Sequence, residues 1–166
     1  MKNRHPKNSR LKRIISGGQT GADRAALDWA IDNAVPHGGW CPKGRKAVDG
    51  RLAAKYILTE TESEGYRQRT RRNVHDSDAT LIVNLGELYG GTLSTKVFAE
   101  KAHKPCLIVA LDADITEELV LTVSDWLERH RPETLNIAGP REQKRPGIYT
   151  LTYQLLDRLA VEISRY

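Results

Sequence analysis

Apolar runs of strand length alternate along the chain with segments in which apolar side chains recur at helical spacing. The predicted strands cover residues 13–16, 38–41, 79–83, 105–111 and 134–138. The predicted helices cover residues 21–33, 66–76, 91–104, 114–127 and 155–163. The unbroken apolar runs at 79–83 and 105–111 indicate strands that are buried on both faces. The fourth helix is expected to begin with a capping box formed by Asp114 and Glu117.

Alternating strands and helices predict an α/β fold, a Rossmann-like three-layer sandwich with a mostly parallel sheet of about five strands. Right-handed crossovers make 2-1-3-4-5 the simplest strand order. That order reverses between the first and third strands, and ligands bind beyond the carboxyl ends of the strands at such a reversal. We expect residues 16–23, 86–95 and the segment after Trp40 to meet there, with residues 139–141 on the same edge but farther away.

Residues 42–64 have no clear periodicity. A loop of this length in a compact domain is often functional. Its basic stretch at 42–46 has two interpretations, a mobile lid that closes over an anion and a solvated basic loop. The pattern does not predict how the segment folds.

The charge of the chain is concentrated at its N-terminus. The 166 residues carry a formal net charge of +5, but residues 1–13 contain six Lys and Arg and no acidic residue, which leaves 20 basic against 21 acidic residues elsewhere. We therefore expect a basic flexible tail at 1–12 and a single Rossmann-like ligand-binding domain at 13–166. A body with so little charge argues against nucleic acid as a partner.

The remaining composition excludes several classes of protein. No apolar run is long enough to span a membrane, and no secretory signal is present, so a cytoplasmic protein without a membrane partner is expected. Two cysteines are too few for a disulfide framework or a structural zinc site, and the histidines lack metal-ligand spacing. No catalytic triad or carboxylate pair is evident, so we assign no catalytic residue and no metal ligand.

A glycine-rich turn between the first predicted strand and helix consists of Ser16, Gly17, Gly18, Gln19, Thr20 and Gly21. Glycines permit a sharp turn and a close approach of the backbone to a ligand. The N-terminus of the following helix attracts an anion. The segment matches neither a Walker A loop nor the usual dinucleotide fingerprint. Its glycines and the helix N-terminus nevertheless predict a phosphate site, with a purely structural turn as the alternative.

A second glycine turn follows the strand at 79–83, where Gly90, Gly91 and Thr92 open the next helix. Two such turns beside one reversal of strand order describe a phosphate cradle with two helix N-termini pointing into it. A chance pair of tight turns is the alternative.

Charged and polar residues near these turns are further candidates. Guanidinium groups bind phosphate in a bidentate manner, so Arg69 and Asn73 in the basic run 66–73 are the preferred ligand contacts. A solvated helix face is the alternative for this run. Asp23 lies in the first turn of the first helix, where its charge complements the helix dipole. It is also a candidate acceptor for a hydroxyl or ring N–H of a ligand.

Several motifs, in this order, resemble the family named "putative molybdenum carrier". They are residues 14–24, 39–45, 69–74, 76–82, 90–92 and 135–141, and the match spans about residues 13–165. The resemblance implies a Rossmann-like fold, a homo-oligomer (dimer or tetramer), and binding or carriage of molybdenum cofactor. This cofactor, molybdopterin, is a pterin phosphate whose dithiolene holds the metal. A nucleotide phosphate is the alternative ligand.

The chain is more distantly similar to the lysine-decarboxylase-like, or LONELY GUY, nucleotide phosphoribohydrolases. Members of that family carry an Arg-Lys pair before the third strand and a glycine turn followed by Glu. Here the corresponding stretch of helix is 67–69, and Ser94 and Thr95 stand where the acidic residue would be. The phosphate-binding half of that site is therefore present, while the hydrolytic carboxylate is missing.

Three functions follow from these features. The first is a binding protein for a small phosphorylated ligand, held by the two glycine turns, Asp23, Arg69 and Asn73. The second is a phosphoribohydrolase that cleaves an N-glycosidic bond, in which Asp23 or Glu60 replaces the missing acid. The third is a nucleotide-sensing module that contacts a partner through its basic tail.

Overall fold

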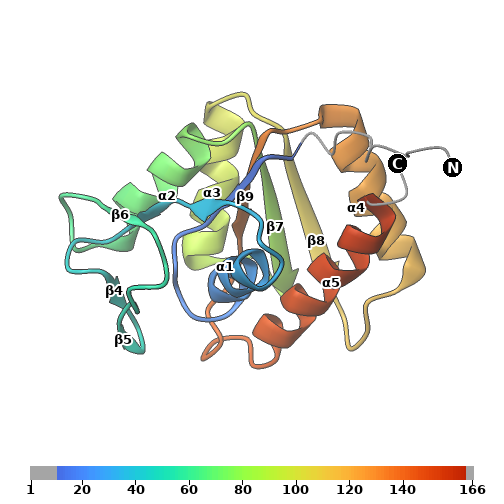
Figure 1. Cartoon of the computed structure of the whole chain (residues 1–166). Helices are drawn as coiled ribbons and strands as arrows, with labels where there is room; N and C mark the ends of the chain where they lie inside the picture. Colours follow the sequence, from blue (N-terminus) through green and yellow to red (C-terminus); the bar gives the residue numbers. More distant parts are fainter. Residues whose placement is uncertain (1–10, 164–166) are drawn as a thin grey trace, which may run out of the picture.

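Five parallel strands form the central sheet of the computed structural model (Figure 1). They are β1 (Arg13–Ile15), β2 (His37–Gly38), β7 (Ala79–Leu85), β8 (Cys106–Leu111) and β9 (Thr134–Ala138). The structure describes residues 11–163, with side chains up to residue 160. Most of the predicted basic tail, residues 1–10, therefore lies outside the described residues.

Helices cover both faces of this sheet. Figure 1 shows α2 (Tyr66–His75) and α3 (Gly90–Lys101) on one face, and α1 (Ala22–Asp32), α4 (Glu117–His130) and α5 (Ile148–Ile163) on the other. The larger apolar core lies on the second face, where Ile14 and Leu81 pack with Val120 and Leu155. The predicted Rossmann-like fold is confirmed. Within residues 11–163, no helix combines the length and apolar character needed to cross a bilayer.

The strand order is β2-β1-β9-β7-β8, so the predicted order 2-1-3-4-5 is wrong. The last strand lies between β1 and β7 and pairs with both, Ile14 opposite Leu135 and Leu81 opposite Ile137. The prediction placed each later strand on the outside of the sheet. An apolar run records that a strand is buried but not which strands lie beside it.

The observed order is that of a Rossmann fold whose chain is read from β9. Numbering β9, β1, β2, β7 and β8 from one to five gives the spatial order 3-2-1-4-5. The direction of strand addition then reverses between β9 and β7, and a ligand crevice is expected at that point. The expectation that residues 139–141 lie farther from the site than the other segments is therefore wrong, because these residues follow the central strand.

Two further expectations need correction. Helix α4 is capped by Thr116, whose side chain accepts a hydrogen bond from the backbone N–H of Leu119, and not by a box that starts at Asp114. Strand β8 forms the edge of the sheet, and its residues 106–108 are only half-buried. An edge strand with helices packed on the sheet can carry the same unbroken apolar run as a central strand, so the sequence does not distinguish the two.

The segment 42–64 folds into short strands around a small core of its own. β4 (Lys46–Ala47) and β5 (Gly50–Arg51) form a hairpin, and β6 (Thr59–Glu60) pairs with β3 (Trp40–Cys41). The predicted strand 38–41 is thus divided between β2 and β3. Leu27 of α1 packs with the buried side chains of Cys41, Leu52 and Tyr56 beneath this segment.

Candidate functional site

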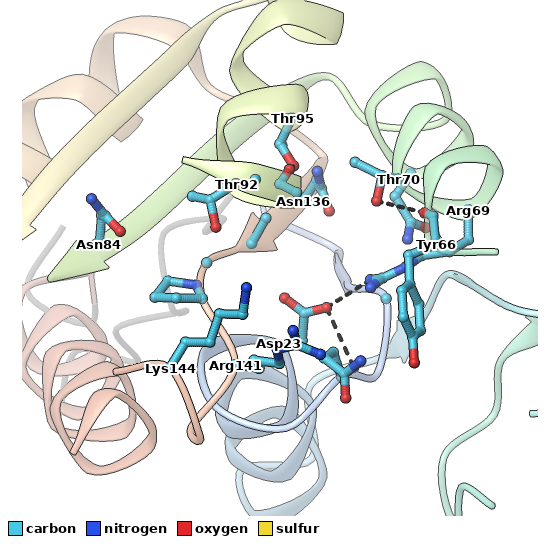
Figure 2. Close-up of a pocket in the computed structure, with 18 of the residues that line it drawn as sticks. Asp23, Tyr66, Arg69, Thr70, Asn84, Thr92, Thr95, Asn136, Arg141 and Lys144 are labelled. Carbon is cyan, nitrogen blue, oxygen red and sulfur yellow. Dashed lines mark hydrogen bonds and ion pairs between the residues drawn. The ribbon is translucent and has the colours of Figure 1, made fainter. Parts of the chain in front are cut away.

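A polar pocket of about 220 Å³ opens where β1, β9 and β7 end (Figure 2). Four regions line it: the turn after β1 with the start of α1, helix α2, the end of β7 with the start of α3, and β9 with the turn after it. The lining residues are Gly17, Gln19, Asp23, Tyr66, Arg69, Thr70, Asn73, Asn84, Tyr89, Gly90, Gly91, Thr92, Thr95, Asn136, Ala138, Gly139, Pro140, Arg141 and Lys144. The pocket lies at the reversal of strand order defined above.

The structure brings most of the predicted site residues to this pocket. Eight of the twelve line it: Gly17, Gln19, Asp23, Arg69, Asn73, Gly90, Gly91 and Thr92. The other four, Ser16, Gly18, Thr20 and Gly21, make structural contacts elsewhere. The Ser16 hydroxyl donates to the carbonyl oxygen of Ile137 at 2.6 Å, and the Thr20 hydroxyl donates to the side-chain oxygen of Gln143 at 2.6 Å.

The two glycine turns differ in what their helices offer to a ligand. Gly21 has φ +86°, and a Cβ there would lie 2.4 Å from the carbonyl oxygen of Pro140. The backbone N–H of Ala22 donates to that same oxygen at 3.3 Å, so the start of α1 is packed against the turn after β9. No side chain caps α3, and the first N–H groups of a helix have no acceptor within it. Helix α3 therefore presents its N-terminus to the pocket.

A buried ion pair links α1 to α2 on the pocket wall. Nη1 of Arg69 donates to Oδ2 of Asp23 at 2.9 Å, and both side chains are almost fully buried. The backbone N–H of Gln19 donates to the same oxygen at 3.4 Å. Burial raises the pKa of Asp23, and the Arg69 guanidinium opposes that shift. The charge of Arg69 is thus already compensated inside the protein.

Asn73 also lines the pocket, but both ends of its amide are bonded to the protein. Its Oδ1 accepts from the backbone N–H of Trp40 at 2.8 Å, and its Nδ2 donates to the Trp40 carbonyl at 3.1 Å. The residue thereby fixes β3 against α2. Its contribution to the pocket is to shape the wall.

Two cations that the sequence did not select complete the pocket. Within residues 11–160, neither Arg141 nor Lys144 forms an ion pair. The ammonium of Lys144 lies 5.1 Å from the ring centre of Tyr89, which is 40% exposed. Arg145 holds the turn after β7 by donating to the carbonyl of Leu85 at 2.5 Å. Arg141 and Lys144 are therefore the pocket's uncompensated positive charges.

Sequence reasoning missed the pocket residues Tyr66, Thr70, Asn84, Tyr89, Thr95, Asn136, Arg141 and Lys144. Correct placement of β9 would have revealed several of them. Asn136 lies in β9, and Arg141 and Lys144 follow it, whereas Asn84 lies in β7, the neighbouring strand. Arg141 is the last residue of the family motif at 135–141, and this motif was the sequence signal that could have identified it.

The segment 42–64 contributes no residue to this pocket. The guanidinium of Arg45 donates to the carbonyls of Ala53 and Tyr56 at 2.9 and 2.7 Å, so its N–H groups bind the backbone of the same segment. Glu60 accepts from the backbone N–H of Gly44 at 2.6 Å, outside the pocket. Burial raises the pKa of the Cys41 thiol, which makes it a poor nucleophile.

No group of three or more His, Cys, Asp or Glu side chains that suits a metal ion occurs among the described residues.

The parallel sheet, the helices on both of its faces and the pocket at the reversal of strand order define a Rossmann-like α/β protein. Comparison with known families specifies the class further: the chain belongs to the circularly permutated YpsA SLOG family, whose model matches residues 14–160. This family is related to the LONELY GUY, or lysine-decarboxylase-like, fold. A circular permutation agrees with the strand order, which becomes that of a Rossmann fold when β9 is read first.

A crystal structure described as "Putative molybdenum carrier protein" from Syntrophus aciditrophicus is similar to this chain throughout. The two share 49% sequence identity, and the alignment covers 90% of this chain and 95% of that one, with a TM-score of 0.87. The search of curated proteins gave no significant match.

Proposed function

We propose that the pocket binds a small phosphorylated heterocycle and that the protein is a carrier or binding protein for molybdenum cofactor. One observation carries the proposal: the two uncompensated cations, Arg141 and Lys144, line the same pocket as the uncapped N-terminus of α3. The name of the relative from Syntrophus aciditrophicus supports the choice of cargo. The alternative cargo is a nucleotide phosphate.

The phosphate would lie between the first turn of α3 and the turn after β9. A helix N-terminus carries a partial positive charge of roughly +0.5, and its N–H groups donate directly to phosphate oxygens. Gly90 and Gly91 have open space where a Cβ would be, so a phosphate group can approach the backbone closely. Arg141 supplies a guanidinium of the kind that binds phosphate through two parallel hydrogen bonds.

The remainder of the pocket suits a flat ring. Tyr66 and Tyr89 both line it, and aromatic side chains stack on heterocycles. In the proposed complex a molybdenum ion remains on the dithiolene of the pterin, and the protein contacts the organic part of the cofactor. Asn84, Asn136 and Thr95 add hydrogen-bonding groups that position the ring.

Thermal unfolding with and without ligands tests this function. Molybdopterin or a nucleotide monophosphate at a hundred times its Kd should add about 2.7 kcal/mol to the free energy of unfolding. Arg141→Ala and Lys144→Ala should each weaken binding about tenfold, because a charge-assisted hydrogen bond is lost. Lys46→Ala, which removes an exposed cation outside the pocket, is the matched control. If no phosphorylated ligand shifts the unfolding temperature, the proposal is wrong.

A second candidate function has one observation in its favour. Asp23 is a carboxyl group in the pocket whose pKa is raised by burial, as in many general acids. Such an acid is what a nucleotide phosphoribohydrolase needs to cleave an N-glycosidic bond. Glu60 lies outside the pocket and is therefore not a candidate for this general acid. Release of free base from AMP, abolished by Arg69→Ala, would favour the enzyme over the carrier.

A homo-oligomer in the cytoplasm remains part of the proposal, because the resemblance implies a dimer or tetramer and the composition suits that compartment. Light scattering should give two or four times the 18.6 kDa of one chain. A monomeric mass at micromolar concentration would contradict the oligomer and leave the pocket unaffected.

A further inference from the structure

One pocket residue does not suit a site that only binds an anion. Asp23 carries a carboxylate in the same pocket as Arg141 and Lys144, and a carboxylate repels phosphate. The residue is 96% buried, since only 4% of its surface is exposed. The ion pair with the buried Arg69 accounts for one oxygen of the Asp23 carboxylate. The second oxygen has no such role.

The contacts of the two oxygens are unequal. The hydrogen bonds from Arg69 and from the backbone of Gln19 both end on Oδ2. Figure 2 shows the other oxygen turned away from these bonds, toward the middle of the pocket. Burial raises the pKa of Asp23, and the ion pair with the Arg69 guanidinium opposes that shift and favours the ionised form. An ionised carboxylate only accepts hydrogen bonds, so this oxygen calls for a donor.

The carboxylate and the first turn of α3 enter the pocket from opposite faces of the sheet, whereas the turn after β9 packs against the start of α1. Asp23 is in the first turn of α1, and Gly90, Gly91 and Thr92 form the first turn of α3. These helices cover opposite faces of the sheet and begin at the same edge (Figure 1). A ligand whose phosphate lies at the start of α3 therefore reaches the carboxylate on α1 when it extends across the pocket.

We propose that Asp23 is a specificity-determining residue that selects phosphorylated ligands with a hydrogen-bond donor directed at its free carboxylate oxygen. This inference rests on the proposed function, which supplies the phosphate. Two groups provide such donors: the amino-lactam edge shared by guanine and pterin rings, and the neighbouring hydroxyls of ribose. A ligand that presents a lone pair at this point is repelled by the carboxylate.

The orientation of the carboxylate is fixed before the ligand arrives. The ion pair with Arg69 holds Oδ2, and the guanidinium lies directly over Gly17. A preformed acceptor costs little ordering when the ligand binds, so its hydrogen bonds contribute to affinity and to discrimination. Discrimination is strong at such a position, because a ligand without donors leaves a buried charged acceptor unpaired.

Calorimetric titration of the wild-type protein with a panel of phosphates tests the inference. GMP and a phosphorylated pterin carry the amino-lactam edge, AMP lacks it, and deoxyribose forms of GMP and AMP lack the 2′-hydroxyl. We expect at least a tenfold tighter Kd either for GMP and the pterin over AMP, or for ribonucleotides over their deoxy forms. Each preference identifies its own donor group. Equal affinity across the panel overturns the inference.

Asp23→Asn then links the preference to the residue, because the amide can place a donor where the carboxylate oxygen accepts. The variant should lose the tenfold preference without weakening the binding of inorganic phosphate. Asp49→Asn, which changes an exposed carboxylate paired with Arg24 outside the pocket, is the matched control and should keep the preference. A preference retained in Asp23→Asn overturns the inference.

The panel separates the two proposals. If phosphates bind and depend on Arg141 but show no preference, only the selection by Asp23 is wrong. If neither inorganic phosphate nor any nucleotide binds, the proposed function is wrong and the selection goes with it. Should Asp23→Asn fail to fold because Arg69 loses its counter-charge, the wild-type panel alone decides.

Discussion

Gly17 has no side chain at the one place where Arg69 needs room. A Cβ on this residue would lie 1.6 Å from Nη1 of Arg69 and 2.9 Å from Oδ2 of Asp23. The glycine is therefore required by a close approach and not by an unusual backbone angle. Its absence of a side chain is what allows a guanidinium from α2 to reach a carboxylate on α1.

Gly17→Ala should break this arrangement. We expect the free energy of unfolding to fall by about 1–3 kcal/mol, because the added methyl group must displace the buried guanidinium. Equilibrium unfolding in urea measures the loss. Gly91→Ala is the matched control, since open space surrounds that position, and it should change stability by less than about 0.5 kcal/mol. Equal losses in the two variants would contradict the account.

The sequence identified single residues better than their partners. Arg69, Asp23 and Gly17 were all predicted as site residues, and all three line the pocket. Their mutual contacts were not predictable, because Asp23 and Arg69 lie 46 positions apart and pair only through tertiary structure. For the same reason Asn73 was chosen as a ligand contact, although its amide is bonded to Trp40.

Two tyrosine hydroxyls connect three elements outside the pocket. The hydroxyls of Tyr56 and Tyr149 donate to the two oxygens of Asp28, at 2.6 and 2.7 Å. Asp28 thus connects α1 to the segment 42–64 and to α5. Burial and the hydrogen bond to Asp28 raise the pKa of Tyr149.

Stability should fall at alkaline pH because of this contact. A folded-state pKa above the unfolded value means that the contribution of Tyr149 is complete below about pH 10 and is lost as the pH rises further. Tyr149→Phe should lower the free energy of unfolding by about 1 kcal/mol at pH 8 and show a shallower fall between pH 8 and 10.5.

Urea unfolding at several pH values measures both effects. Tyr66→Phe is the control, because the Tyr66 hydroxyl has no hydrogen-bond partner among the described residues, and it should follow the wild-type curve. A Tyr149→Phe curve parallel to that of the wild type would show that the contact does not titrate.

At the level of elements, periodicity located the helices and strands but not their neighbours. The predicted limits of α1, α2 and β9 agree with the structure within about a residue or two. Strand order depends on pairing between distant segments, which leaves no local signal. The fold of residues 42–64 was not predictable for a related reason. Hydrogen bonds from Arg45 to backbone carbonyls and a few apolar side chains at irregular spacing organise the segment, and neither leaves a periodic pattern.

The whole molecule is a Rossmann fold whose first strand and helix stand at the end of the chain. The turn after β9 takes the place of the first strand–helix turn, which is the usual site of phosphate binding in this architecture. This position explains why Arg141 and Lys144, near the C-terminus, line a pocket with residues from the first 25 positions. The pocket depends on the spatial order of the strands and not on where the chain begins.

Reversing the permutation tests that dependence. A chain of residues 132–166 followed directly by 1–131 would begin with β9 and have the strand order 3-2-1-4-5. A second version of the chain carries a flexible Gly-Ser linker between residues 166 and 1, so that the length of the connection does not decide the outcome. The break falls at Arg131, an exposed residue that ends α4.

This permuted chain should fold with the circular dichroism spectrum of the wild type and bind phosphorylated ligands within about threefold of its affinity. Opening the same joined chain between Glu87 and Leu88 supplies the control. That break cuts the turn held by Arg145, so the control should lose at least tenfold in affinity while its core remains intact. If the break at Arg131 costs as much affinity as the break at Glu87, the pocket depends on chain order beyond the strand arrangement, and the permutation account is wrong.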